Sequence, residues 1–187
     1  LRVFFSILFL FFFLPSSLIA KKLIIDNLSN PGKSVQLQNW SFITDGVMGG
    51  LSEGQAFIYS DDKIPCYKMI GNVTTENNGG FIQIRLPILP NIKVNKHNGL
   101  YLKIRGNNKK YSIHIRTSIS LGYWQYYKYS FHVNDDWNEI NIPFENFKKS
   151  NYSQPNRLLN QNIKTIALVA GFDNFYADIC LAEIGFY

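Results

Sequence analysis

Short runs of alternating apolar and polar residues follow one another along the chain from residue 54 onward. In residues 100–105 the even positions are aliphatic, and Tyr111, Ile113 and Ile115 alternate with polar neighbours. A side-chain period of two places alternate residues on opposite faces of a β-strand. The recurrence predicts an all-β fold, with strands at 54–60, 64–70, 80–86, 99–105, 110–117, 124–133, 137–142, 163–170 and 175–186.

Segments rich in Asn, Asp and Gly separate these runs, at 77–80, 95–99, 106–108 and 134–136. They favour turns because Gly and Asn tolerate a positive φ and Asp bonds nearby backbone. We therefore place Asp135-Asp136 in a hairpin turn rather than in a catalytic carboxylate pair. No repeat, long amphipathic helix or low-complexity linker follows residue 20, so residues 21–187 are expected to form one domain.

The first twenty residues have a different pattern. Arg2 precedes an apolar run from Val3 to Leu14 that only Ser6 interrupts, and Lys21 opens the polar part of the chain. These are the features of a secretory signal peptide, so we expect residues 1–20 to direct export to the periplasm or beyond. The alternative is an uncleaved membrane anchor. It is less favoured because spanning a bilayer takes about 20 apolar residues and Pro15 ends this run early.

The alternation also predicts a basic and aromatic surface. If the strands at 99–105, 110–117 and 124–133 lie side by side, one outer face carries both cations and rings. Aromatic rings stack on sugar rings, and Arg bonds sugar hydroxyls. The alternative is that the segment 146–162 covers these rings. The face comprises Lys103, Arg105, His114, Arg116, Trp124 and Tyr126, of which we name Arg105, Arg116, Trp124 and Tyr126 as candidate ligand contacts.

Composition and motifs exclude several classes of function. The chain has 187 residues and a net charge of +6, but it has no basic helix, zinc-finger spacing or RNA-binding signature, so no nucleic-acid partner is expected. No hydrolase elbow, zinc-protease helix or phosphate loop is present, and His97, His114 and His132 lack metal-ligand spacing. We expect a protein that is not an enzyme and needs no cofactor or metal. The two cysteines, Cys66 and Cys180, can pair after export or lie buried as small apolar side chains.

The strongest local signal is Trp40-x₄-Asp45-Gly46-Val47-Met48-Gly49-Gly50-x-Ser52. Three glycines in five residues permit backbone conformations that other residues resist. The interpretation we favour is a structural turn between two strands, with the Asp45 carboxylate bonding nearby N–H groups. The alternative is a loop that offers Asp45, Met48 and backbone N–H groups to a ligand.

This motif and several that follow it resemble the complex I intermediate-associated protein 30 family. The resemblance covers about residues 40–184. It is carried by Trp40, Asp45, Gly46, Met48, Gly49, Gly50, Ser52, Asn78, Gly79, Gly80, Phe81, Gly106, Trp137, Pro143 and Phe144.

The resemblance implies a galactose-binding-like jelly-roll β-sandwich. It also implies a non-catalytic assembly factor or chaperone that binds a protein partner, such as a membrane respiratory complex I (NADH:ubiquinone oxidoreductase) or its intermediates. Asn107 departs from the family pattern, which often has an acidic residue there. The alternative function is a secreted carbohydrate-binding module that uses the basic and aromatic face.

Overall fold

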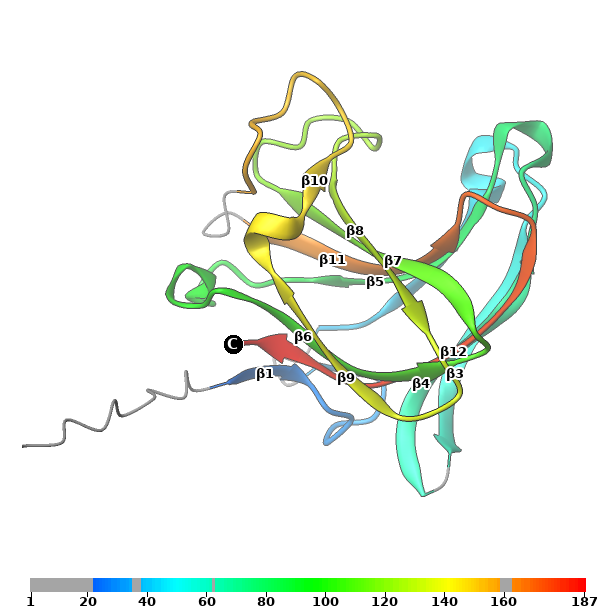
Figure 1. Ribbon diagram of the computed structural model, residues 1–187, viewed down its shortest axis with the longest axis horizontal. Coiled ribbons are helices and arrows are strands. Elements are labelled where there is room, and N and C mark those ends of the chain that lie inside the picture. The colour runs from blue at the N-terminus through cyan, green and yellow to red at the C-terminus, as the bar shows by residue number, and fades with distance from the viewer. Residues whose placement is uncertain (1–21, 35–37, 62, 159–162) are drawn as a thin grey trace, which may run out of the picture.

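The computed structural model describes residues 22–34, 38–61, 63–158 and 163–187, so the expected signal segment 1–20 lies outside the described residues. Strands dominate this part of the chain, as the alternating pattern predicts (Figure 1). The strands are β1 (Leu23–Asp26), β2 (Ser41–Thr44), β3 (Glu53–Asp61), β4 (Ile64–Val73), β5 (Phe81–Pro87), β6 (Gly99–Gly106), β7 (Lys109–Thr117), β8 (Tyr127–Val133), β9 (Asn138–Pro143), β10 (Lys148–Lys149), β11 (Ile163–Gly171) and β12 (Phe175–Phe186). Short 3-10 helices occupy η1 (Asp45–Met48), η2 (Glu76–Asn78), η3 (Val94–Lys96) and η4 (Phe144–Asn146).

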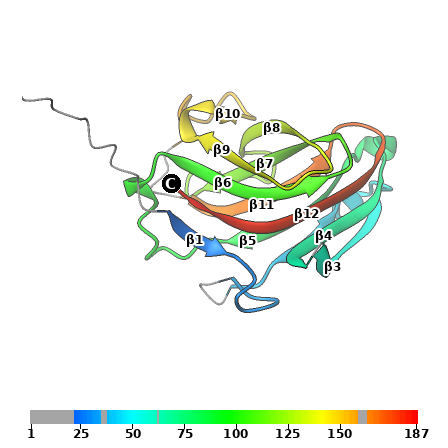
Figure 2. The same cartoon turned by 60° about the horizontal axis from the view of Figure 1, so that its bottom comes forward.

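These strands form two antiparallel sheets that lie face to face (Figures 1 and 2). The first sheet has the order β3-β4-β12-β6-β9, and β1 pairs with the C-terminal part of β12. The second sheet has the order β10-β8-β7-β11-β5-β2. β3 and β4 are consecutive in the chain, as are β7 and β8, but the other neighbours in each sheet come from distant parts of the chain, as in a jelly roll. The predicted all-β sandwich is confirmed.

The apolar face of each strand points between the sheets. Leu100, Leu102 and Ile104 of β6 are fully buried there, as are Ile113 and Ile115 of β7. Burial of each such side chain stabilises the fold by about 1.5–3 kcal/mol relative to exposure. The predicted period of two therefore identifies the core face of these strands correctly.

Two predictions about neighbouring strands are wrong: the strands at 99–105 and 110–117 do not lie side by side, and Asp135-Asp136 do not form a hairpin turn. In both places the chain crosses from one sheet to the other. Asn107 and Asn108 join β6 of the first sheet to β7 of the second, and residues 134–137 carry β8 back to β9 of the first. The Asn107 amide donates to the Tyr176 carbonyl (2.7 Å), and the Gly106 N–H donates to the Asn134 carbonyl (2.7 Å). These bonds hold the two crossings against the sandwich, so Asp135 and Asp136 lie in a crossing segment and not in a hairpin turn.

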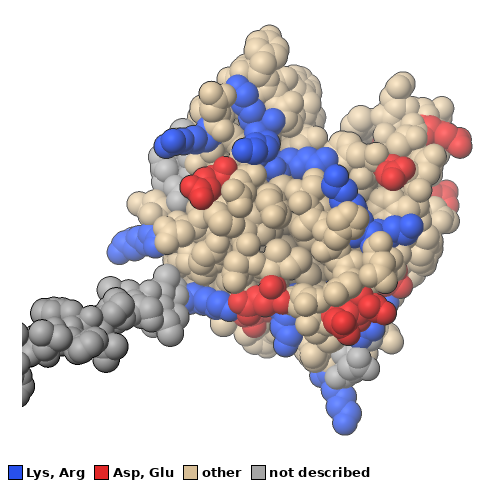
Figure 3. All heavy atoms as spheres, in the orientation of Figure 1, with Lys and Arg blue, Asp and Glu red and all other residues tan. Residues whose placement is uncertain are grey.

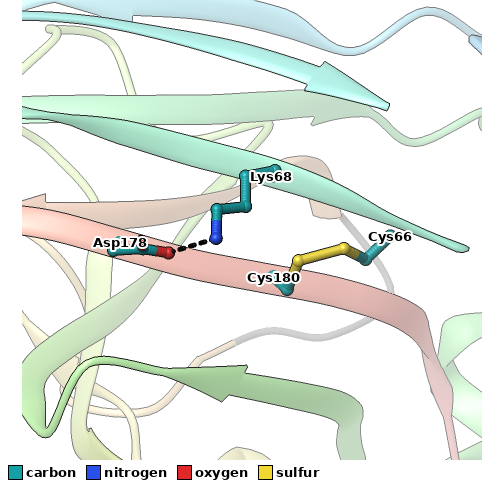
Figure 4. Close-up of a disulfide and its surroundings, with 4 residues drawn as sticks. All are labelled: Cys66, Lys68, Asp178 and Cys180. Carbon is teal, nitrogen blue, oxygen red and sulfur yellow. Dashed lines mark ion pairs between the residues drawn. A yellow bond between two sulfur atoms is a disulfide. The ribbon is translucent and has the colours of Figure 1, made fainter. Parts of the chain in front are cut away.

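A disulfide joins Cys66 of β4 to Cys180 of β12 (Figure 4), with their Cα atoms 5.4 Å apart. Ala182, Ile64 and Trp137 pack against the two buried cysteines. An ion pair between Lys68 and Asp178, 2.8 Å long, links the same two strands (Figure 4). Of the two interpretations of the cysteines, the structure shows the paired one.

Candidate ligand-binding face

Asp45 is the centre of the glycine-rich motif, and its carboxylate points inward. It is fully buried and accepts hydrogen bonds from the Ser52 N–H (2.9 Å), the Ser52 hydroxyl (2.5 Å), the Gly80 N–H (2.5 Å) and the Phe81 N–H (3.1 Å). Desolvation acts to raise the pKa of Asp45, but these hydrogen bonds outweigh it and hold the pKa below its ordinary value. The group binds the protein's own backbone, as the structural-turn interpretation predicts.

Two glycines of the motifs make room for this carboxylate. A Cβ on Gly50 would lie 2.3 Å from the Asp45 carboxyl carbon, and one on Gly79 would lie 2.5 Å from its oxygen. Asn77 and Asn78 turn the chain with positive φ values of 54° and 58° so that the Gly80 N–H reaches Asp45. The two Gly-rich segments, 35 residues apart, therefore form one structural unit.

The other family-motif residues are also mostly structural. The Trp40 indole N–H donates to the buried Asp26 carboxylate (2.7 Å), and its ring packs on Tyr67. Trp137 covers the disulfide, and Phe144 packs on Phe147 in the core. The exception is Met48, which is exposed beside Val47 and Leu51 at the end of the sandwich that bears the motif.

The predicted basic and aromatic face is only partly assembled. His114, Arg116 and Tyr126 do lie together on the outer face of the second sheet, the side that points away from the core. Lys103 and Arg105 belong to β6 of the first sheet, so including them in this face was wrong. The reason is the crossing at Asn107 and Asn108, which the alternating pattern does not reveal.

The centre of this outer face is closed by stacked rings. The Tyr126 ring stacks on the His114 imidazole, with the ring centroids 4.0 Å apart and an interplanar angle of 9°. The centroid of the Phe172 ring lies 5.8 Å from that of the same imidazole. His114 is 8% exposed, and desolvation together with the charge of Lys128 lowers its pKa to about 3. The imidazole is therefore neutral at pH 7, and the ammonium of Lys128 lies 3.8 Å from the Phe172 ring centroid.

Trp124 lies beside this face, because β8 begins at Tyr127 and not at the predicted residue 124. It belongs to residues 118–126, which are bonded to residues 150–155; we call the two segments together the double loop. The Ser150 hydroxyl accepts from the Tyr126 N–H (2.9 Å) and donates to the Trp124 carbonyl (2.5 Å), and the Gln125 amide donates to the Ser153 hydroxyl (2.9 Å). Figure 1 shows the two segments projecting together beyond the second sheet.

The tip of the double loop carries Trp124, which the sequence predicts as a ligand contact, together with Tyr123, Leu121 and Tyr152, which it does not. Tyr123 is 84% exposed and Trp124 is 64% exposed, and Leu121 and Tyr152 are also exposed. The Arg116 guanidinium lies 5.6 Å from the Tyr123 ring centroid and donates to the Gly122 carbonyl (3.1 Å). These residues have no strand periodicity, so only the density of aromatic residues between 123 and 129 signals them.

A groove of about 380 Å³ runs along the β8–β10 edge of the outer face. Figure 3 shows the surface hollowed between the double loop and the end of the sandwich that bears η1 and η2, with Lys and Arg gathered over β8 and β10. Within the described residues no cluster of His, Cys, Asp and Glu can hold a metal ion, and no helix there is long and apolar enough to cross a membrane. The groove is lined by Tyr126, Lys128, Tyr129, Ser130, Asn146, Lys148, Lys149 and Ser150.

The fold defines a class, the galactose-binding-like β-sandwiches. A family 11 carbohydrate-binding module from Clostridium thermocellum, solved with a β-1,3-1,4-mixed-linked tetrasaccharide, has a TM-score of 0.69 at 18% identity, covering 88% of this chain and 94% of that one. The family 30 module of the cellulosomal cellulase Cel9D-Cel44B from the same organism has a TM-score of 0.53 at 12% identity, covering 74% and 87%. A comparison with curated proteins gave no match.

The family follows from the sequence. The pattern of complex I intermediate-associated protein 30 matches residues 29–181, so the chain belongs to that family, as the motif resemblance predicts.

Proposed function

We propose that the protein is a non-catalytic binding module that binds a carbohydrate on the outer face of the second sheet, beside the double loop. The observation that carries the proposal is the exposure of Tyr123 and Trp124 on a hydrogen-bonded loop next to Arg116. Exposed rings stack on sugar faces, and nearby polar groups fix the orientation of the sugar. The similarity in fold to the family 11 module, whose structure contains a tetrasaccharide, supports the same conclusion.

A binding role also suits the chemistry of the face better than a catalytic one. A general base works best when its pKa lies near the operating pH. His114 has a pKa of about 3 and is covered by the rings of Tyr126 and Phe172, so it is poorly suited to accept a proton from a substrate at pH 7.

The test is binding of the full chain to an array of polysaccharides, followed by titration calorimetry on any ligand found. Trp124→Ala should weaken binding at least about tenfold, which corresponds to about 1.4 kcal/mol, because a stacking surface is lost. Tyr176→Ala is a matched control, since Tyr176 is 50% exposed but lies in the first sheet. Binding that survives Trp124→Ala, or no binding to any polysaccharide, would contradict the proposal.

A second candidate function is a protein contact of the assembly-factor kind, and family membership favours it. The exposed apolar side chains of Val47, Met48 and Leu51 at the motif end offer a surface for a partner. Affinity capture from membranes should then recover respiratory complex I subunits with the wild type and fewer with Met48→Ser. Equal recovery with the two proteins, or none with either, counts against this role.

We also propose that the chain is exported. The apolar segment 3–14 after Arg2 and the Cys66–Cys180 disulfide both support this, because disulfides persist mainly in oxidising compartments.

A further inference from the structure

The strand register sets one straight row of side chains across the outer face of the second sheet. Arg85 of β5 and His114 of β7 both lie opposite Ala167 of β11. Lys128 of β8 lies opposite His114, and Lys148 of β10 lies opposite Lys128. Adjacent strands are about 4.8 Å apart, so the row from Arg85 to Lys148 spans roughly 19 Å. We call Arg85, Lys128 and Lys148 the basic row; the neutral imidazole of His114 lies between them and is covered by the rings of Tyr126 and Phe172.

No acidic side chain in the described part of the chain forms an ion pair with the cations of this row. The ion pairs between described residues are Lys22–Glu139 and Lys68–Asp178, and neither includes a residue of this face. Arg116 adds a further cation beside the row; desolvation and the charge of Arg85 lower its pKa. Its Nε is buried and has no hydrogen-bond partner within the described residues. Like charges held together without counter-charges favour an anionic ligand.

The neighbouring row is uncharged and able to form hydrogen bonds. Gln83 of β5 and Ser112 of β7 both lie opposite Val169 of β11, and Ser130 of β8 lies opposite Ser112. Ser112 is buried and its hydroxyl lies 3.2 Å from Nε2 of His114, so the half-buried Gln83 and Ser130 are the members of this row whose amide and hydroxyl groups can bind the hydroxyls of a sugar. A ligand that lies along both rows meets cations on one side and neutral hydrogen-bonding groups on the other.

We propose that the ligand of the outer face is an acidic polysaccharide, whose carboxylate or sulfate groups contact Arg85, Lys128 and Lys148 while its hydroxyls contact the neighbouring row. This inference rests on the proposed carbohydrate function. The linear arrangement favours a chain with repeated anionic groups, and Tyr123 and Trp124 offer ring stacking next to Arg116.

The probe is polygalacturonate, with fully methyl-esterified polygalacturonate as the matched neutral polymer and a mixed-linked β-glucan as an unrelated neutral one. Dextran sulfate tests whether sulfate replaces carboxylate. Affinity electrophoresis and calorimetry with the full chain should show binding to polygalacturonate at least about tenfold tighter than to its methyl ester. Raising the NaCl concentration from about 0.05 M to about 0.5 M should weaken it, because exposed charges are screened.

The variant that tests the basic row is Arg85→Gln/Lys148→Gln, and it should lose at least about fivefold in affinity for polygalacturonate. Lys33→Gln/Lys63→Gln removes the same charge from exposed positions outside the second sheet and should bind as the wild type does. An equal loss in both double variants would mean attraction to net charge alone and would overturn the proposal.

The remaining outcomes separate this inference from the proposed function. Binding of the neutral β-glucan or the methyl ester as tightly as polygalacturonate, abolished by Trp124→Ala, would overturn the acidic ligand but keep the carbohydrate site. No binding to any glycan would overturn both. Thermal unfolding of each variant shows that it is folded, so a loss of binding is not a loss of the fold.

Discussion

At the scale of the residue, Asp45 shows how the most recognisable residue of a family motif can have a structural role. Its carboxylate accepts three backbone N–H groups and one hydroxyl, from Ser52, Gly80 and Phe81, and Gly50 and Gly79 leave it just enough space. A carboxylate satisfied in this way stabilises the protein but has little capacity left for a ligand. The position of this carboxylate explains why residues 50 and 79 are glycines, because a Cβ at either position would collide with it.

Asp45→Asn should destabilise the protein by about 2–3 kcal/mol at pH 7, because an amide replaces one acceptor oxygen with a donor facing N–H groups. The folded pKa of Asp45 lies below its unfolded value of 3.8, so its contribution is present above that pH and is lost as the pH falls through the folded value. Urea unfolding should therefore show a large difference between variant and wild type at pH 7 and a smaller one near pH 3. The exposed Asp135→Asn is the control, and wild-type stability of Asp45→Asn at pH 7 would refute this role.

The sequence predicted the turn at Asp45 but not its partners. Three glycines in five residues permit backbone conformations that other residues resist, and Gly49 adopts one with a φ of 86°, so the turn is a local property. The Gly80 N–H that reaches the carboxylate lies 35 residues away, and no spacing rule connects the two segments. Two separate Gly-rich motifs were therefore visible in the sequence, while their contact emerged only from the packing of the sheets.

At the scale of the element, the positions of the strands could be predicted from the sequence, but the sheet to which each strand belongs could not. The segment 175–186 coincides with β12, because alternation and apolar content follow from each strand's own environment. Whether β6 and β7 form a hairpin or cross between sheets depends on the two residues Asn107 and Asn108 and on their distant partner Tyr176. Alternation is identical in the two cases, so Arg105 was assigned to the wrong face.

The double loop marks a second limit of the periodic pattern. Three of the four residues from 123 to 126 are aromatic and only Gln125 is not, so the pattern extended the predicted strand to residue 124. In the structure the Ser150 hydroxyl takes the Tyr126 N–H, and the strand begins one residue later at Tyr127. The exposed rings of the candidate site thus lie in a loop, where hydrogen bonds between side chain and backbone decide the conformation.

At the scale of the whole molecule, the disulfide connects stability with cellular location. Cys66 and Cys180 enclose a segment with a sequence separation of 114, and the ion pair between Lys68 and Asp178 joins the same two strands. A covalent link across so long a loop restricts the unfolded chain far more than the folded one. The strands β4 and β12 are neighbours in the first sheet, so the link also protects that sheet from opening.

Removing the disulfide should lower the free energy of unfolding by about 2–5 kcal/mol. In urea unfolding, the wild type should lose that amount when a reductant is added, whereas Cys66→Ala/Cys180→Ala should start at the lower stability and not respond.

If the protein is exported, thiol labelling of the full chain taken from its own cell should find both cysteines protected, and a chain retained in a reducing cytosol should be labelled at both. Free thiols in the exported protein would contradict the pairing, and a reductant effect on the Cys-free variant would show that the stability difference has another origin. Because the disulfide lies on the first sheet and the proposed ligand on the second, wild-type protein in reductant should still bind its ligand wherever it remains folded, and this separates the loss of stability from the loss of the site.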